Sequence, residues 1–198
     1  MNAELTLEEK NKDLLILVDE SDKALGFKSK SECHEGNGTL HRAFSVFIFN
    51  PLGQLLIQKR SSNKELWDLH WSNSCSSHPQ KNEQMELAVK RRLKEELGIE
   101  CPVHYLYKFT YHAKYKDLGS EHELCHVYVG LFDGEIKANP EEIDDWKFIK
   151  PDDLCNYIKQ SDLKVIDKRG FVFNFLKWNW NLSHQDLSVN FVISSVKN

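Results

Sequence analysis

Five side chains in this sequence have the types and spacing of a divalent-metal site. They are His34, His41, His78, Glu121 and Glu123. If residues 121–128 form a strand, its side chains alternate, so the carboxylates of Glu121 and Glu123 share one face. Two such carboxylates repel each other unless a cation or a proton lies between them. Imidazole and carboxylate ligands suit Zn²⁺, Mn²⁺ or Mg²⁺. Spacing alone leaves two interpretations open: a site for one of these ions, or surface and structural histidines beside a solvated strand edge.

A second group of reactive side chains lies in a stretch with helical spacing. Arg92 and Glu96 are four residues apart, which places both side chains on one face of a helix. An exposed ion pair of this kind stabilises a protein by only about 0.3–0.5 kcal/mol. In a functional site, Arg92 would instead bind a phosphate group while Glu96 binds a metal ion that bridges phosphate oxygens. Spacing alone leaves both interpretations open.

The same helix lies within a longer motif that resembles a degenerate Nudix box. The motif runs from Ser77 through Glu83 to Arg91-Arg92-Leu93-Lys94-Glu95-Glu96-Leu97-Gly98-Ile99. It departs from the Nudix pattern at two positions, where Ser77 replaces a glycine and Arg92 replaces a glutamate. The second change removes a metal-binding carboxylate and adds a cation, so it argues against ordinary pyrophosphate hydrolysis.

Five blocks of sequence, taken in order, resemble type I isopentenyl-diphosphate isomerase, a family of the Nudix superfamily. The blocks are Lys30-x3-His34-x6-His41, Gln58-Lys59-Arg60-x3-Lys64, Trp67 to Trp71-Ser-Asn-Ser-Cys-Ser-Ser-His-Pro, Arg91-Arg92 to Glu96-Leu97-Gly98, and Glu121-His-Glu123. Together they cover roughly residues 14–157 and are more specific than any single block. The resemblance implies an enzyme that interconverts isopentenyl and dimethylallyl diphosphate by adding a proton to one carbon and removing one from another.

The resemblance also implies a role for each matching residue. The family's octahedral metal site would be formed by His34, His41, His78, Glu121 and Glu123. The cations that hold the diphosphate would be Lys30, Arg60, Lys64 and Arg92. Glu96 would bind a Mg²⁺ ion carried by the diphosphate, and Glu123, with Tyr111 nearby, would act on one face of the alkene. A divalent metal is therefore the expected cofactor, and a small isoprenoid diphosphate is the expected ligand.

The residue expected to act on the other face of the alkene differs from the family pattern. The family's catalytic cysteine lies two residues before the metal-binding histidine, and this chain has Ser76 at that position. A serine hydroxyl is a far weaker acid or base than a thiol at neutral pH, so Ser76 argues against full isomerase activity. Cys75 could substitute only if the loop shifts by one residue, and a small buried apolar side chain explains it equally well. Neither Trp178 nor Trp180 matches the family's pocket tryptophan.

These departures leave two alternatives to an isomerase. A Nudix hydrolase of an isoprenoid or nucleoside diphosphate would keep Glu95 and Glu96 but lack the carboxylate at position 92. A relative that binds a diphosphate or a metal without turnover would be consistent with Ser76. The isomerase is the leading hypothesis, because the metal and diphosphate residues are all present.

The elements that must position these residues follow from hydrophobic spacing. Strands are predicted at residues 14–19, 44–49, 54–59, 103–112 and 122–131, with turns at 22–26 and 50–53. A helix is predicted over residues 83–97, where Met85, Val89, Leu93 and Leu97 recur every four positions, with Asn82 as its cap and Gly98 at its end. A short helix at Pro151–Tyr157 and a packed aromatic tail over Gly170–Trp180 complete the prediction. The fold class is therefore α/β: a single Nudix-like domain over residues 1–198, with a mixed β-sheet sandwiched between helices and a core at about 14–157.

The composition excludes several other classes of protein. The formal net charge is −4, which gives no electrostatic reason to bind nucleic acid or an anionic membrane. No segment is long and apolar enough to span a bilayer, and the polar N-terminus lacks the features of a secretory signal. The five cysteines are odd in number and loosely spaced, which indicates reduced thiols. We therefore expect a cytoplasmic protein, monomeric or homodimeric, that binds neither nucleic acid nor membrane.

Overall fold

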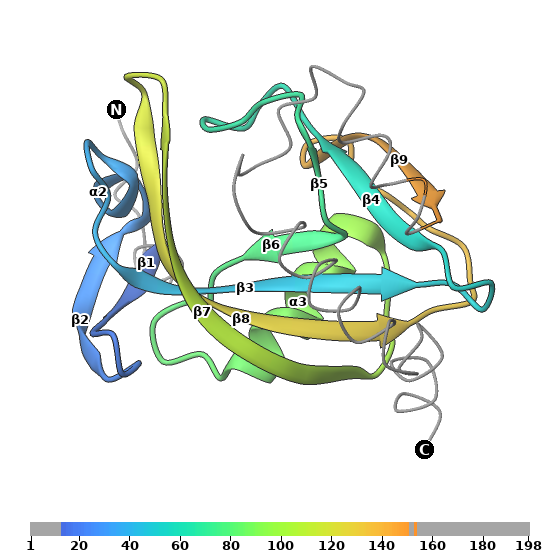
Figure 1. The fold of residues 1–198 in the computed structure, drawn as a ribbon, viewed down its shortest axis with the longest axis horizontal. Coiled ribbons are helices and arrows are strands. Elements are labelled where there is room, and N and C mark those ends of the chain that lie inside the picture. Colours follow the sequence, from blue (N-terminus) through green and yellow to red (C-terminus); the bar gives the residue numbers. More distant parts are fainter. Residues whose placement is uncertain (1–12, 151–152, 154–198) are drawn as a thin grey trace, which may run out of the picture.

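Nine strands form one mixed sheet in the computed structural model, which describes residues 13–150 and Asp153. The strands are β1 (Leu14–Val18), β2 (Ala24–Ser29), β3 (His41–Phe49), β4 (Leu55–Arg60), β5 (Trp71–Ser72), β6 (Cys75–Ser77), β7 (Val103–Tyr115), β8 (Gly119–Leu131) and β9 (Ile143–Ile149). Strand β3 is central, because β1, β4, β6 and β8 all pair with it. The pairing of β3 with β8 is parallel and the other pairings are antiparallel, which confirms the predicted mixed sheet. The long β7–β8 hairpin curves along β3 in Figure 1.

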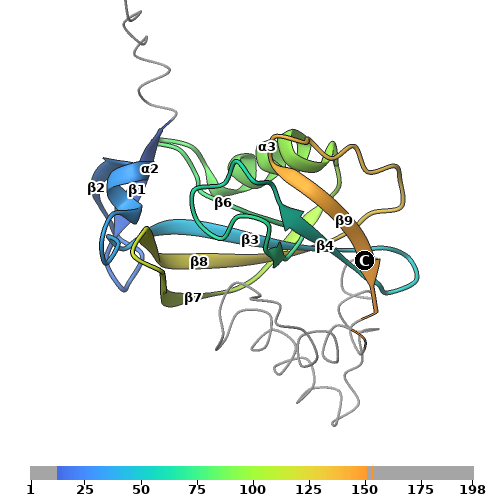
Figure 2. The ribbon, with the colours of Figure 1, turned by 90° about the horizontal axis from the view of Figure 1, so that it is seen from above.

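One helix covers one face of this sheet. Helix α3 (Met85–Leu97) packs with its apolar stripe against the sheet, and the two views agree on its place (Figures 1 and 2). The buried core between helix and sheet includes Phe44, Val46, Ile48, Leu56, Val89, Leu93 and Leu97. Gly98 ends the helix in the left-handed conformation, with φ 67°, as the sequence predicts. The predicted start was wrong, because Gln84 is the N-cap and Asn82 lies two residues earlier with φ 65°.

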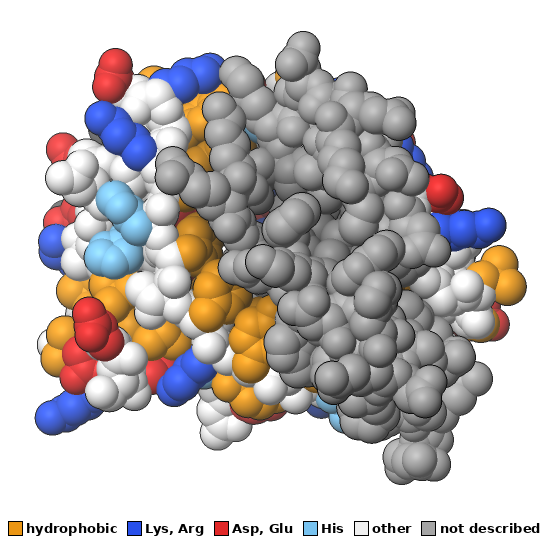
Figure 3. Space-filling view, in the orientation of Figure 1, with side chains coloured by type: hydrophobic (Ala, Val, Ile, Leu, Met, Phe, Trp, Pro, Cys, Tyr) orange, Lys and Arg blue, Asp and Glu red, His pale blue; other side chains and the backbone are white. Residues whose placement is uncertain are grey.

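The opposite face of the sheet carries a second apolar cluster. Its buried members are Phe47, Phe49, Leu55, Ile57, Val127 and Val129. Partly buried aromatic side chains of β7, among them Tyr107 and Phe109, extend this cluster. Hydrophobic side chains follow the curve of the β7–β8 hairpin on the side shown in Figure 3. Neither described helix is part of this cluster.

A short helix that was not predicted from the sequence connects strands β2 and β3. Helix α2 (Lys30–His34) begins at Ser29, whose side chain accepts a hydrogen bond from the backbone of Glu32. Glu32 in turn accepts one from the backbone of Ser29, which completes a capping box. His34 is therefore the last residue of a helix.

The remaining expectations have mixed outcomes. The hairpin of β3 and β4 and strands β1, β7 and β8 are confirmed, whereas β2, β5, β6 and β9 were not predicted. The turn predicted at 22–26 was wrong over residues 24–26, because these residues pair with β1 as the start of β2. Apart from Asp153, the predicted helix at Pro151–Tyr157 lies outside the described residues, and so does the aromatic stretch Gly170–Trp180. The four described cysteines are free thiols. No helix in the described part of the chain is long and apolar enough to cross a bilayer.

Candidate active site

The strand register brings the predicted site residues to one face of the sheet. His41 of β3 lies beside Glu123 of the parallel strand β8. On the other side of β8, Tyr111 of β7 is the register partner of Glu123. Ser45 of β3 pairs with Ser76 of β6. Because strand side chains alternate, these groups share the face opposite to helix α3.

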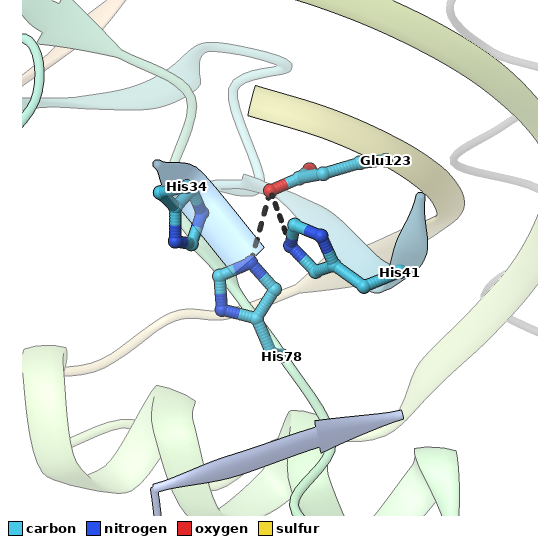
Figure 4. Close-up of side chains that lie close together, drawn as sticks. All are labelled: His34, His41, His78 and Glu123. Carbon is cyan, nitrogen blue, oxygen red and sulfur yellow. Dashed lines mark hydrogen bonds and ion pairs between the residues drawn. The ribbon is translucent and has the colours of Figure 1, made fainter. Parts of the chain in front are cut away.

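Three histidines and one glutamate form a compact cluster on this face. His34, His41, His78 and Glu123 each offer a ligand atom, and these atoms all lie within 4.8 Å of one another. Figure 4 shows the three imidazole rings gathered around the Glu123 carboxylate. The Nε2 atom of His78 lies 2.9 Å from Oε1 of Glu123, and Nε2 of His41 lies 3.7 Å from the same oxygen. Four of the five predicted metal ligands are thus brought together.

The hydrogen bonds around the cluster suit a bound cation. The Nδ1 atoms of His34 and His41 each lie 2.7 Å from a backbone carbonyl, of Lys30 and Thr39 respectively. Carbonyls only accept, so each Nδ1 carries a hydrogen, and in a neutral ring with this tautomer Nε2 has the free lone pair. Nε2 of His41 is buried and has no hydrogen-bond partner among the described residues. Burial lowers the pKa of His78 to about 3, so its ring is neutral, the form that binds metals.

Glu121, the fifth predicted ligand, lies just outside this four-residue group. Its Oε2 atom is 2.9 Å from the Tyr111 hydroxyl, which is also 2.7 Å from Oε2 of Glu123. Burial, together with the neighbouring Glu123 charge, raises the pKa of Glu121 to about 7. The structure therefore joins the two carboxylates through Tyr111, and metal ligation by Glu121 remains a prediction.

A cavity of about 480 Å³ opens beside the cluster. Its lining includes the acidic and hydroxyl groups Tyr111, Glu121, Glu123 and Ser76. All four cations predicted to hold a diphosphate line it too: Lys30, Arg60, Lys64 and Arg92. The cavity therefore lies between the cluster of three histidines and Glu123 and a group of four cations.

The Arg92 guanidinium contacts three carboxylates at the edge of this cavity. Its Nε and Nη2 atoms donate to Oε1 of Glu96 at 3.1 and 2.7 Å, and Nη1 donates to Glu95 at 2.8 Å. Nη2 also donates to Oε1 of Glu142 at 2.9 Å. Glu96 is only 2% exposed and also accepts a hydrogen bond from Gln58. The guanidinium thus places a fixed positive charge among carboxylates of the Nudix-like motif.

Ser76 and Cys75 point to opposite faces of β6. The Ser76 hydroxyl donates to Oδ1 of Asn73 at 2.8 Å and lies 2.8 Å from the Ser45 hydroxyl. Cys75 is fully buried in the core cluster under α3 and is absent from the cavity lining. Burial, followed by the nearby Glu96 charge, raises the pKa of Cys75 well above its usual value. The structure therefore places the serine, and not the cysteine, beside the cavity.

Three residues that shape this site were not predicted from the sequence. Ser45 and Asn73 hold the Ser76 hydroxyl, and Glu142 contacts both Lys64 and Arg92. Ser45 could have been found from β3, because it lies two positions after Ala43 and four after His41 on the same face. Glu142 has no comparable signal, since it comes from the loop before β9, fifty residues after Arg92.

Comparison with known proteins gives consistent matches. Residues 39–172 match the family profile of the NUDIX domain. Isopentenyl-diphosphate Delta-isomerase 1 of Photorhabdus laumondii subsp. laumondii is 46% identical over 151 residues, covering 75% of this chain and 85% of that protein. Isopentenyl-diphosphate Delta-isomerase 2 of Aromatoleum aromaticum is 42% identical over 137 residues, covering 69% and 72%. The crystal structure of DR0079 from Deinococcus radiodurans, at 23% identity, has a similar fold, with a TM-score of 0.66 over 83% of this chain and 97% of that one.

Proposed function

We propose an activity from one premise: this chain belongs to the isopentenyl-diphosphate Delta-isomerases, within the Nudix superfamily. The proposed reaction interconverts isopentenyl and dimethylallyl diphosphate. One proton is added at one carbon of the substrate and one is removed from another, with a carbocation-like centre between the two steps. Such chemistry needs an acid and a base on the two faces of the alkene and a site that excludes bulk water.

One observation carries this proposal. A single cavity is lined by proton-transferring groups, Glu123, Tyr111 and Ser76, and by four cations. The cations would bind the diphosphate, and the neighbouring groups would then face the hydrocarbon part of the same molecule. Binding energy from the diphosphate would hold the alkene in place for proton transfer.

Hydrogen bonds join the Tyr111 hydroxyl to the carboxylates of Glu121 and Glu123. One phenolic hydrogen cannot be donated to Glu121 and Glu123 at once. The hydroxyl therefore donates to one carboxylate at a time and accepts or releases its own hydrogen between them. We propose that the Tyr111 hydroxyl and the Glu123 carboxylate act together in proton transfer on one face of the alkene.

A divalent metal fits the histidine cluster in this proposal. His34, His41, His78 and Glu123 would hold the ion, with Glu121 as a further ligand. Zn²⁺, Mn²⁺ and Mg²⁺ are all compatible with these imidazole and carboxylate ligands. A bound cation would supply positive charge that stabilises the ionised form of the carboxylates around it. Glu96 stays a proposed ligand of the Mg²⁺ that arrives with the diphosphate. Because Glu96 is buried and bonded to Arg92, its carboxylate would have to turn toward the cavity to bind this ion.

Ser76 is proposed to act on the other face of the alkene. Its hydroxyl lies between Asn73 and Ser45, so its oxygen is oriented by two hydrogen bonds. A hydroxyl exchanges protons much less readily than a thiol does. We expect slow turnover for this reason, and we propose no catalytic role for the buried Cys75.

The hydrolase alternative is less well supported. In this chain Arg92 stands where the Nudix box has a glutamate, and its guanidinium occupies the space between Glu95, Glu96 and Glu142. Position 92 therefore provides no carboxylate ligand for the metal ion that hydrolysis would require there. Cytoplasmic location and a monomeric or homodimeric state stay predictions.

Product analysis tests the proposal directly. The pure protein is incubated with isopentenyl diphosphate, Mg²⁺ and Mn²⁺, and the products are separated. Dimethylallyl diphosphate is the expected product. Release of phosphate or pyrophosphate would favour the hydrolase instead. Binding without any product would favour a relative that has lost turnover.

A further inference from the structure

Glu142 links two of the cations that line the cavity. Its carboxylate accepts a hydrogen bond from Nζ of Lys64 and another from Nη2 of Arg92, at 2.9 Å for the latter. Lys64 comes from the loop after β4, Arg92 from helix α3 and Glu142 from the loop before β9. The Glu142 side chain is 21% exposed, and all three residues line the cavity. One carboxylate thus ties together cations from two different elements.

The donors of Arg92 are already largely occupied. A guanidinium has five N–H bonds. Four of them point to carboxylate oxygens among the described residues: one to Glu95, two to Glu96 and one to Glu142. A phosphate oxygen entering the cavity can therefore gain the Arg92 donor held by Glu142 only by displacing that carboxylate. Glu96 is nearly fully buried and Glu95 faces outward, so Glu142 is the carboxylate that competes from the cavity.

Glu142 also carries its negative charge under ordinary conditions. Burial alone would raise the pKa of Glu142, but the hydrogen bond from Lys64 and the charges of Lys64 and Arg92 lower it to about 2. A diphosphate that binds these cations therefore meets an ionised carboxylate. The negative charge of the Glu142 carboxylate repels the negative charge of a phosphate group that binds the same cations, and this repulsion is strong in a partly buried site.

We propose that Glu142 is the counter-ion of the cations Lys64 and Arg92 in the diphosphate site, an inference that rests on the proposed function. It holds Lys64 and Arg92 in place when no ligand is bound and competes with the diphosphate for both. This competition weakens diphosphate binding and speeds diphosphate release, because the Glu142 carboxylate forms its ion pairs with the two cations again as the ligand leaves. Glu142 is thus a positioning residue that sets affinity, and it has no part in proton transfer.

Glu141 provides a matched control. It lies next to Glu142 and lines the same cavity, but its carboxylate accepts a hydrogen bond from the Asn63 amide, and no ion pair with a described cation is found. Glu141→Gln and Glu142→Gln remove the same charge from neighbouring positions. Only the second change frees Lys64 and Arg92 from a counter-ion.

Binding of inorganic pyrophosphate, measured by titration calorimetry without added Mg²⁺, tests the inference. We expect Glu142→Gln to bind pyrophosphate about tenfold more tightly than the unchanged protein, whereas Glu141→Gln changes the Kd by less than about twofold. Mere structural damage would weaken binding, so tighter binding separates the two explanations. Glu142→Ala provides the same test if the glutamine variant does not fold.

Three outcomes would overturn the inference. Equal or weaker binding by the Glu142 variants would show that the carboxylate does not compete with the ligand. Equal tightening by both glutamine variants would show a general charge effect with no special role for Glu142. No pyrophosphate binding by any variant, the unchanged protein included, would instead remove the diphosphate site itself and so the proposed function.

Discussion

Replacing Ser76 by cysteine is expected to make the protein faster and less stable at once. The hydroxyl makes two hydrogen bonds of 2.8 Å, to Asn73 and Ser45, and a larger sulfur atom cannot keep both at that length. Each such bond contributes roughly 0.5–1.5 kcal/mol, so the loss should be about 1–3 kcal/mol. For a chain of this size, about 1 kcal/mol lowers the melting temperature by roughly 2–4 °C.

The same change should raise the rate of isomerisation. General acid–base catalysis contributes about 10²–10⁴-fold, and a thiol at this position is a far better proton donor and acceptor than a hydroxyl. We therefore expect Ser76→Cys to form dimethylallyl diphosphate about a hundredfold faster. Turnover is measured by separating the two diphosphates, and stability by thermal unfolding. Cys75→Ala is the control, and its rate per folded molecule should equal that of the unchanged protein.

A rate for Ser76→Cys no higher than that of the unchanged protein would refute this reasoning, provided that metal content and pyrophosphate binding are intact. An increase that Cys75→Ala abolishes in the double variant would refute it differently. The chemistry would then belong to Cys75, although that side chain lies on the α3 side of the sheet.

Three further predictions address the metal, the core and the effect of pH. His78→Ala should lower the metal content per chain, measured by atomic emission, whereas the exposed His104→Ala should leave it unchanged; equal losses would exclude a specific site. Leu93→Ala, at 1% exposure, should cost about 2–5 kcal/mol in denaturant unfolding, whereas Leu87→Ala, 55% exposed on the same helix, should stay within about 0.5 kcal/mol. The lowered pKa of Glu142 means that its carboxylate stabilises the fold above pH 4.5, the ordinary value, and loses this contribution as the pH falls toward 2. The stability difference between the unchanged protein and Glu142→Gln should therefore shrink from pH 6 to pH 2, and a constant difference would contradict this assignment.

Local spacing was sufficient to predict the elements that have a strong periodic pattern. Helix α3 follows from apolar residues every four positions. The strand predicted at 122–131 corresponds to β8, and the alternation of side chains in a strand correctly placed Glu121 and Glu123 on one face. Helix α2 was missed because five residues are too few for a periodic pattern, although Ser29 and Glu32 have the types and spacing of a capping box. Strand β9 was missed because Asp144 and Asp145 interrupt its hydrophobic pattern. The strand is stabilised by its pairing with β4, which the local sequence does not reveal.

The site was predictable in its residue types but not in its internal contacts. His41 and Glu123 are 82 positions apart, and a parallel β3–β8 register is what places them side by side. No spacing rule reveals such a register, so the histidine cluster could be proposed only from resemblance to a family. The same limit applies to Ser76 and Cys75, because the direction in which β6 presents them depends on its pairing with β3.

Arg92 shows how the structure changes the interpretation of a residue pair found in the sequence. From the sequence, Arg92 and Glu96 could be an ordinary surface pair of little energetic value. In the structure, Glu96 is 2% exposed, and Glu142 approaches the same guanidinium nitrogen from another loop. Removing Arg92 would leave these carboxylates without their shared cation, and because Glu96 is buried, we expect this change to destabilise the fold. In the proposed function, this fixed positive charge would help to bind the diphosphate, while the groups around Glu123 and Ser76 would carry out the proton transfers.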